Sequence, residues 1–350
     1  MTEIIMFNNL FKKFSKNLGI DLGTANTLVY VDGRGVVINE PSVVAVNTRT
    51  EQILAVGAEA KEMLGKTPPH IITTRPLING IISDFEVTEK MLRYFFDKVY
   101  DGRSNFLTRP KVIIGAPLDI TEVEKKAIRD AAISAGAKEV WIVEEPMAAA
   151  IGSRMPVREP VGNLIVEIGG GTCEIAVISL GGIVHWKSMH IAGDEFNRNI
   201  ISYTRDNFSL LLGEKQAEEI KIKIGSAIEM GDHIQFPMRG RDLITGLPKE
   251  IMISDDQVRE AISKSLKTIV DGIKETLEIT PPELVADIHE RGILISGGGA
   301  LLRGIDKLIS RATNIPVRIA DDPLTSVVRG TGILLDEPEL LREVSIGPES

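Results

Sequence analysis

The feature that most constrains this fold is a unit that occurs twice in the chain. Residues 18–31 read LGIDLGTANTLVYV, and residues 164–178 read LIVEIGGGTCEIAVI. Each copy runs from an apolar strand through an acidic residue and a glycine turn to a threonine and a second strand. Two such hairpins about 145 residues apart predict a duplicated domain with one copy per lobe. Because no linker rich in Pro, Gly or Ser separates them, we expect the lobes to share a rigid core and a cleft.

The length of the chain agrees with two lobes, and its charge, cysteine and histidine content argue against several classes of protein. A chain of 350 residues exceeds what one hydrophobic core usually serves. Its net charge of −9 argues against bulk nucleic-acid binding, which needs a basic footprint. The single cysteine, Cys173, allows no intramolecular disulfide and indicates a reducing compartment. The five histidines are scattered without zinc spacing, so we expect no structural metal site.

Strand and helix patterns alternate along most of the chain and predict mixed α/β layers. Helix starts are marked by capping boxes at Thr121-x-x-Glu124 and Ser254-x-x-Gln257, and by a proline at the first helical position in Thr280-Pro-Pro-Glu283. The Val- and Ile-rich runs predict strands at 18–22, 27–31, 42–46, 111–116, 140–143, 164–168, 173–178, 183–187 and 293–296.

The two glycine turns have the composition of phosphate loops. Glycines let a phosphate approach backbone N–H donors, and a hydroxyl adds a further donor. Gly23-Thr24-Ala25-Asn26 and Gly169-Gly170-Gly171-Thr172 both meet this description. The acidic residues Asp21 and Glu167 would repel the phosphates unless Mg²⁺ lay between them. The pair of loops therefore predicts a nucleotide–Mg²⁺ site.

Two further segments each allow two interpretations, and a third resembles a phosphate-binding motif that we reject. Gly297–Gly299 and Ala300 follow a strand and lead into a helix, which suits either a ligand at a helix N-terminus or a tight β–α turn. Glu145 ends a strand, where it would orient water toward a phosphate or only stabilise a helix N-terminus as a surface carboxylate. Residues 60–67 fit a loose Walker A pattern, but Pro68 and Pro69 follow at once, so we reject a P-loop.

These pieces together resemble the actin/sugar-kinase/DnaK-chaperone superfamily, and within it the MreB family of bacterial actins. The resemblance covers nearly the whole chain. It rests on GIDLGTANTLVY, NEPSVVAV, VGAEAKEMLGKTP, RPLINGIISDFEV, EEPMAAAIGS, IGGGTCEIAVISLGGIV, AGDEF, AEEIKIKIG, TPPELVADI and RGILISGGGALLRG. It implies the α/β actin-like (duplicated ribonuclease H-like) fold, with two lobes around a nucleotide cleft and four subdomains. These are IA (18–40, 74–150, 326–350), IB (41–73), IIA (151–189, 249–325) and IIB (190–248).

The resemblance also implies roles for individual residues. ATP or ADP would be held by Gly23, Thr24, Ala25 and Asn26 from the first lobe and by Gly169, Gly170, Gly171 and Thr172 from the second. Residues Glu218, Glu219, Ile220 and Lys221 would contact the nucleoside, and Gly297, Gly298, Gly299 and Ala300 would close over it. Asp21 and Glu167 would serve Mg²⁺, and Glu145 with Thr172 would position the attacking water.

Two positions depart from the family pattern. Glu167 stands where the second loop usually has aspartate, and Cys173 stands where it usually has a second threonine. The extra methylene shifts the carboxylate by more than about 1 Å, a misplacement that costs about 100-fold in such chemistry. We therefore expect nucleotide binding with slow hydrolysis, or a glutamate that reaches Mg²⁺ directly. Cys173 is expected to face the sheet interior as a small apolar residue.

The N-terminus predicts an amphipathic helix. No apolar run reaches the roughly 18 residues of a membrane-spanning helix. Within residues 1–17 the apolar side chains fall on helical spacing opposite lysines, which suits an interfacial anchor, although a helix packed on its own domain is the alternative. The resemblance implies a second anchor in the loop Asn105–Thr108, whose apolar pair has a local core plug as its alternative. The predicted membrane residues are Ile4, Phe7, Leu10, Phe11, Phe14, Phe106 and Leu107.

The leading functional hypothesis is a membrane-associated cytoskeletal ATPase, because the resembled family polymerises with ATP into antiparallel double protofilaments. Those filaments lie on the inner face of the cell membrane and organise cell-wall elongation and rod shape. The resemblance implies RodZ, MreC, MreD and the elongation enzymes as partners, in the cytoplasm and without nucleic acid. A small-molecule kinase is the second hypothesis, but no motif supplies a sugar site. A DnaK-like chaperone, the third, needs a substrate-binding domain after the ATPase.

Overall fold

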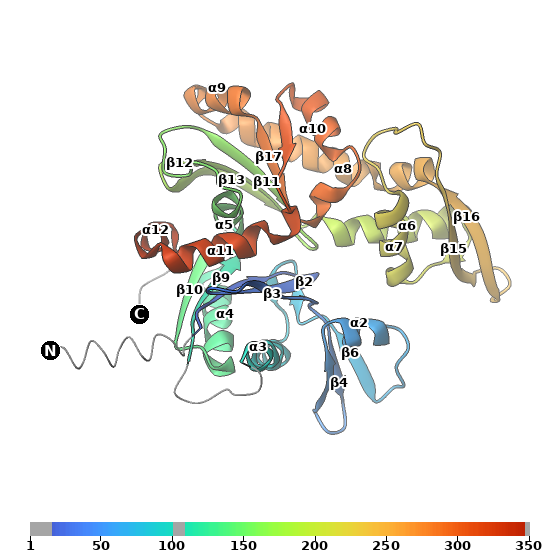
Figure 1. Cartoon of the computed structure of the whole chain (residues 1–350). Coiled ribbons are helices and arrows are strands. Elements are labelled where there is room, and N and C mark those ends of the chain that lie inside the picture. Colours follow the sequence, from blue (N-terminus) through green and yellow to red (C-terminus); the bar gives the residue numbers. More distant parts are fainter. Residues whose placement is uncertain (1–15, 101–108, 347–350) are drawn as a thin grey trace. The chain divides into compact units, whose positions relative to one another are not determined.

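The structure, a computed structural model, describes residues 16–100 and 109–346. Its chain divides into two compact units, one formed by the described parts of Met1–Glu159 and Thr325–Ser350, and the other by Pro160–Leu324. Each unit is built on a five-stranded sheet flanked by helices (Figure 1). The expected mixed α/β architecture is confirmed.

The sheet of the first unit has the order β10-β9-β1-β2-β3. Its central hairpin joins β1 (Leu18–Leu22) to β2 (Asn26–Val31), and β3 (Gly35–Pro41) continues antiparallel. On the other side, β9 (Lys111–Ala116) and β10 (Glu139–Glu144) run parallel to β1. The carboxyl ends of β1, β9 and β10 therefore meet at one edge of this sheet.

The second unit repeats this order strand for strand as β18-β17-β11-β12-β13. The hairpin of β11 (Asn163–Ile168) and β12 (Cys173–Ser179) is again central, with β13 (Gly182–Met189) antiparallel beyond it. Strands β17 (Ile293–Ser296) and β18 (Val317–Ile319) are the parallel pair. Even a register irregularity recurs, between β2 and β3 and between β12 and β13. The predicted duplication is confirmed.

Alternation along the strands decides which side chains enter each core. Leu18, Ile20 and Leu22 of β1 are buried in a cluster with helices α3 (Phe85–Val99) and α4 (Glu122–Ala135). The alternate residues Gly19 and Asp21 lie on the opposite face of the sheet. There, a Cβ added to Gly19 would lie 2.5 Å from Thr331 Oγ1 of α11 (Ser326–Asp336), so the glycine permits close helix–sheet packing.

Smaller elements complete each unit. In the first unit they are β4 (Val44–Asn47), β5 (Ile53–Val56), α2 (Ala58–Met63), β6 (Ile71–Thr74), β7 (Leu77–Ile78), β8 (Ile81–Ile82), α5 (Glu145–Gly152) and α12 (Pro338–Val344). In the second they are α6 (Gly193–Phe208), β14 (Leu210–Leu211), α7 (Glu214–Ile224), β15 (Gln235–Asp242), β16 (Pro248–Ser254), α8 (Asp255–Ile279), α9 (Pro282–Arg291), the 3-10 turn η1 (Gly298–Leu301) and α10 (Ile305–Thr313). A second 3-10 turn, η2 (Pro323–Thr325), lies at the boundary.

The predicted helix starts are confirmed. Complete capping boxes begin α4 at Thr121 and α8 at Ser254, and Pro282 is the first residue of α9. The rejection of a P-loop is also confirmed, since α2 ends at Met63 and no helix starts at Lys66 or Thr67. Cys173 is fully buried in the core of the second unit, as expected. The boundaries of the four subdomains stay a prediction.

Candidate functional site

The glycine turn of the first unit lies at the tip of the β1–β2 hairpin. The backbone N–H groups of Gly23, Thr24 and Ala25 donate to no backbone carbonyl within the described part of the chain. A Cβ added to Gly23 would lie 2.8 Å from the Asn26 carbonyl oxygen, so a side chain there would distort the turn. Adjacent N–H donors without protein acceptors form a concavity suited to an anion.

Two hydroxyl groups hold this turn in place. The buried Ser42 Oγ donates to the Gly23 carbonyl at 2.6 Å and lies 2.9 Å from Thr27 Oγ1. Thr24 Oγ1 accepts a hydrogen bond from the Gly80 N–H at 2.7 Å, which leaves the Thr24 hydroxyl proton for another acceptor. The motif reasoning identified Thr24 but assigned no role to Ser42 or Gly80, although both lie in stretches that carry the family resemblance.

The carboxyl edge of the first sheet brings together the two predicted catalytic acids of this unit. Asp21 pairs with Gly115 of β9, and Gly115 pairs with Val143 of β10, so Glu145 follows two residues after the same row. A Cβ added to Gly115 would lie 3.4 Å from the Glu145 Cγ. In open α/β sheets, ligands bind at this edge.

The environments of the acids differ. Burial raises the pKa of Asp21 from 3.8 to about 7. Glu145 is 6% exposed and is the first residue of α5, so it is a buried acid at a helix start and not the surface carboxylate of the alternative interpretation. Burial also raises the pKa of the neighbouring Glu144, and the charge of Lys125 opposes that shift. A cation bound beside such a carboxyl group would stabilise its charged form and lower its pKa.

Backbone N–H groups hold the glycine turn of the second unit. The N–H groups of Gly193 and Asp194, at the start of α6, donate to the carbonyls of Gly169 and Gly170 at 3.2 and 2.8 Å. The Gly169 N–H donates to the Thr172 carbonyl at 2.8 Å and closes the turn. Within the described chain, the N–H groups of Gly170 and Gly171 have no backbone acceptor. They are the counterpart of the donors in the first turn.

Each turn has a carboxylate beside its first glycine. A Cβ added to Gly23 would lie 3.5 Å from Asp21 Oδ1, and one added to Gly169 would lie 3.4 Å from Glu167 Oε2. The longer Glu167 side chain also reaches the third glycine cluster, because a Cβ on Gly297 would lie 2.3 Å from its Oε1. Across the hairpin, Glu167 pairs with the buried Glu174, whereas Asp21 pairs with Leu28.

The predicted nucleoside residues lie on α7 and η1. Lys221 Nζ donates to the Gly193 carbonyl at 2.8 Å, so this helix contacts the segment that holds the second turn. Glu218 is partly buried and Glu219 exposed, while Ile220 is fully buried in the core. In the third cluster, Gly297 lies directly before η1 and adopts φ 80° and ψ 175°, and a Cβ on Gly299 within η1 would collide with Ile168. Sequence reasoning gave no role to Gly193.

Other predicted residues are outside what the structure tests. Ile4, Phe7, Leu10, Phe11, Phe14, Phe106 and Leu107 lie outside the described residues. Within residues 16–100 and 109–346, no helix has the length and apolarity to cross a bilayer. Over the same residues, no group of three or more His, Cys, Asp or Glu side chains forms a metal cluster.

Comparisons with known proteins identify the family. The family model described as MreB/Mbl protein matches residues 15–343. The chain belongs to the MreB/Mbl family. It is 47% identical over 328 residues to the cell shape-determining protein Mbl of Bacillus subtilis (strain 168), covering 94% of this chain and 98% of that protein. It is 49% identical over 327 residues to the cell shape-determining protein MreB of Escherichia coli (strain K12), covering 92% and 94%.

Solved structures agree with this family. MreB5 of Spiroplasma citri bound to ADP has a TM-score of 0.88 at 38% identity, covering 93% of this chain and 97% of that one. The same protein bound to AMPPNP has a TM-score of 0.89 at 39% identity, with the same coverage. The MamK double helical filament, at 21% identity and a TM-score of 0.78 over 92% and 99% of the chains, shares the fold. The actin-like fold expected from the MreB/Mbl resemblance is confirmed.

Proposed function

We propose that this chain is an ATP-dependent, filament-forming cytoskeletal protein that helps to determine bacterial cell shape. The observation that carries the proposal is the pair of glycine turns, each offering N–H donors without backbone acceptors beside one carboxylate. Support comes from MreB5 of Spiroplasma citri, 38–39% identical, which was solved with ADP and with AMPPNP. An adenine nucleotide with a polyphosphate is therefore the ligand that best suits both turns.

In this proposal each part of the nucleotide has its own residues. The N–H groups of the two turns, with the Thr24 and Thr172 hydroxyls, take the phosphates. The face of α7 carrying Glu218 and Lys221, with Glu219 and Ile220 between them, takes the nucleoside, and Gly297–Gly299 with Ala300 cover it. The Lys221 contact with Gly193 supports this arrangement, because Gly193 in turn donates to the Gly169 carbonyl of the phosphate turn.

Mg²⁺ fits the donor set of both turns. Each carboxylate lies beside the first glycine of its turn, where a bound phosphate would otherwise repel it. Asp21 and Glu167 would hold the ion, directly or through water, as is usual for a cation that keeps part of its hydration shell. The ion would neutralise the charge between carboxylate and phosphate. Glu145 and Thr172 would orient the attacking water, and hydrolysis would be slow because Glu167 replaces aspartate.

We further propose that the filaments are antiparallel double protofilaments on the inner face of the membrane, where they organise cell-wall elongation with RodZ, MreC and MreD. Residues 1–17 and the pair Phe106 and Leu107 would be the anchors. Two weak anchors on each subunit, repeated along a filament, would bind strongly through avidity. The proposal follows from membership of the MreB/Mbl family and from the pattern of these segments.

Sedimentation tests the central claim. With ATP and Mg²⁺ the protein should pellet above a critical concentration, and without nucleotide it should stay in the supernatant. A protein that remains monomeric at high concentration with ATP and lipid would contradict the filament proposal. Removal of residues 1–17, or a double change of Phe106 and Leu107 to serine, should weaken co-sedimentation with anionic vesicles. Unchanged co-sedimentation when both changes are combined would refute the anchor assignment.

A further inference from the structure

The segment that leaves the C-terminus of α7 is held by one arginine from the other side of the second unit. Arg303 Nη2 donates to the Ile224 carbonyl at 3.0 Å, and its Nε donates to the Gly225 carbonyl at 3.2 Å. Its third nitrogen, Nη1, pairs with Asp232 at 2.5 Å. The last carbonyls of a helix lack intrahelical partners and attract cations, so the Arg303 guanidinium caps α7.

Backbone contacts reinforce this link. The Ala227 N–H donates to the Arg303 carbonyl at 2.7 Å, and Ser226 forms a parallel bridge with Arg303. A Cβ added to Gly225 would lie 3.1 Å from Leu302 Cδ1, and one added to Gly304 would lie 2.6 Å from Ile228 Cγ1. Residues 224–232 and 302–304 therefore form a closely packed pair of segments, which we call the α7 clasp.

The α7 clasp joins the two elements that hold the nucleoside in the proposed function. One turn before Ile224, α7 carries Lys221, which contacts Gly193 at the second glycine turn. On the other side, Arg303 lies two residues after Leu301, the last residue of η1, and η1 is preceded by Gly297, where an added Cβ would lie 2.3 Å from Glu167 Oε1. The clasp thus fixes the spacing between the face of α7 and the glycines of η1.

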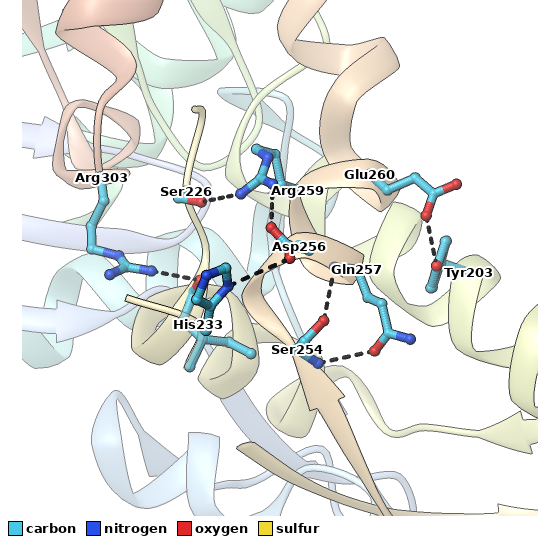
Figure 2. Close-up of polar contacts among 10 residues, drawn as sticks. Tyr203, Ser226, His233, Ser254, Asp256, Gln257, Arg259, Glu260 and Arg303 are labelled. Carbon is cyan, nitrogen blue, oxygen red and sulfur yellow. Dashed lines mark hydrogen bonds and ion pairs between the residues drawn. The ribbon is translucent and has the colours of Figure 1, made fainter. Parts of the chain in front are cut away.

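A second arginine, from helix α8, contacts the same segment at Ser226. Arg259 of α8 donates to Ser226 Oγ at 3.5 Å and pairs with Asp256, while His233 Nδ1 lies 4.0 Å from Asp256 (Figure 2). These contacts tie residues 226–233 to α8 and do not involve η1. Of the two arginines, Arg303 is the one that relates α7 to η1.

We propose that Arg303 is a positioning residue for the nucleoside, which it does not itself contact. This proposal rests on the proposed nucleotide function. The planar guanidinium donates in three directions at once, to two carbonyls and to a carboxylate, which a lysine ammonium on a flexible stem does not reproduce. Without this link, α7 and η1 would keep their own folds but lose their fixed spacing, so adenosine would be held less well while the phosphate turns stayed intact.

The test compares Arg303→Ala and Arg303→Lys with the full-length wild type. We expect the dissociation constants of ATP and ADP to rise about tenfold in Arg303→Ala, by the loss of charged hydrogen bonds. Inorganic tripolyphosphate, which lacks the nucleoside, should compete for the wild type and for Arg303→Ala with equal affinity. The hydrolysis rate at saturating ATP should stay within about twofold, so the effect appears in KM and leaves kcat unchanged. Arg303→Lys should show an intermediate loss.

Two matched variants control for general effects. Arg239→Ala removes an exposed arginine side chain of the same unit that pairs with Glu250. The backbone N–H of residue 239, which donates to Gln216 of α7, is kept in the variant, so it should bind ATP as the wild type does. Asp232→Asn removes the ion pair of Arg303 but keeps its two carbonyl contacts, and should change the affinity less than Arg303→Ala does.

The outcomes separate the claims. Wild-type affinity for ATP in folded Arg303→Ala overturns the positioning role, and so does an equal loss of affinity for ATP and tripolyphosphate, which indicates general disruption. If Arg303→Ala does not fold, Arg303→Lys decides, and wild-type affinity in that variant overturns the proposal. If the wild type itself fails to bind ATP, the proposed function is refuted instead.

Discussion

The two glycine turns occupy the same place in two sheets of the same order, yet they are held by different means. In the first unit, the side-chain hydroxyls of Ser42 and Thr24 connect the turn to distant residues, beside one backbone bond from the Ser42 N–H to the Ala25 carbonyl. In the second, the backbone N–H groups of Gly193 and Asp194 bind the turn directly. The first turn therefore depends in part on side-chain hydroxyls that a substitution can remove, whereas the contacts of the second are made by backbone groups that a substitution leaves in place.

The difference also extends to the carboxylates. Asp21 pairs with an apolar residue, Leu28, and its burial favours the protonated acid. Glu167 pairs with another glutamate and reaches the glycine cluster of η1. Duplication thus preserved the backbone of the site while each copy acquired its own supports. The two tryptophans allow each copy to be followed separately, since Trp141 lies in β10 of the first unit and Trp186 in β13 of the second.

The largest expected effect is that of adding one methyl group to the second unit. In Gly297→Ala, the new Cβ would lie 2.4 Å from the Ile168 carbonyl oxygen, and the backbone would keep φ 80° and ψ 175°, a region open essentially to glycine alone. Strain and overpacking together should lower the free energy of unfolding by about 4 kcal/mol. Urea unfolding followed by Trp186 fluorescence in a Trp141→Phe background measures it.

Gly246→Ala is the matched control for this change. Gly246 also has a positive φ, of 75°, but a Cβ there meets nothing within 4 Å. It should lose only about 1 kcal/mol, the conformational cost of a left-handed residue. Equal losses in the two variants would show that the contact with Ile168 and Glu167 is unimportant.

The second effect is a pH dependence that belongs to the first unit. The pKa of Asp21 is about 7 in the folded protein and 3.8 in the unfolded chain, so between these values the folded state holds a proton that the unfolded state has released. Stability must then fall as the pH rises from about 4 to about 7 and level off above that. The full shift corresponds to about 4 kcal/mol, and because Asp21 keeps some exposure to solvent we expect about half.

Asp21→Asn isolates this contribution, since the amide mimics the neutral acid. Without nucleotide, the difference in unfolding free energy between the variant and the wild type should grow in favour of the variant across that pH range. Trp141 fluorescence in a Trp186→Phe background follows the first unit. If the difference in unfolding free energy did not change with pH, the pKa of Asp21 would not be raised in the folded protein, and the prediction would be wrong.

The third effect tests the hydroxyls of the first turn. Ser42→Ala leaves the Gly23 carbonyl and Thr27 Oγ1 without their shared partner in a buried place, which should lower the stability of the first unit by about 1.5 kcal/mol. Thr48→Ala removes an exposed hydroxyl that donates to the His70 carbonyl and should change stability by less than about 0.5 kcal/mol. The unfolding transition of the second unit, followed by Trp186 fluorescence, should stay where it is in the wild type. A shift of that transition in Ser42→Ala would contradict the idea that the two turns are supported separately.

The strands and turns of the site were predictable because they depend on local pattern. The apolar run of β1 and the capping boxes of α4 and α8 lie where the sequence places them. The supports of the turns were not predictable, because Ser42 and Gly80 meet the first turn from 19 and 56 residues away. Only tertiary packing brings them there. Likewise, nothing local in the AGDEF stretch signals that the Gly193 N–H would bind the second turn.

The smallest expected effect concerns the carboxylate in which the two turns differ most. In Glu167→Asp, the shorter side chain would withdraw its oxygen from the space beside Gly297 and restore the length that Asp21 has in the first turn. If the extra methylene slows hydrolysis, phosphate release with ATP and Mg²⁺ should rise about tenfold, equivalent to about 1.4 kcal/mol in the barrier. Asp21→Glu is the reciprocal control and should lower the rate, because it introduces the same misplacement in the other unit. An unchanged or lower rate in Glu167→Asp would mean that the longer side chain already reaches its working position. In that case, its approach to Gly297 is part of the site, and the second turn has adapted to the glutamate.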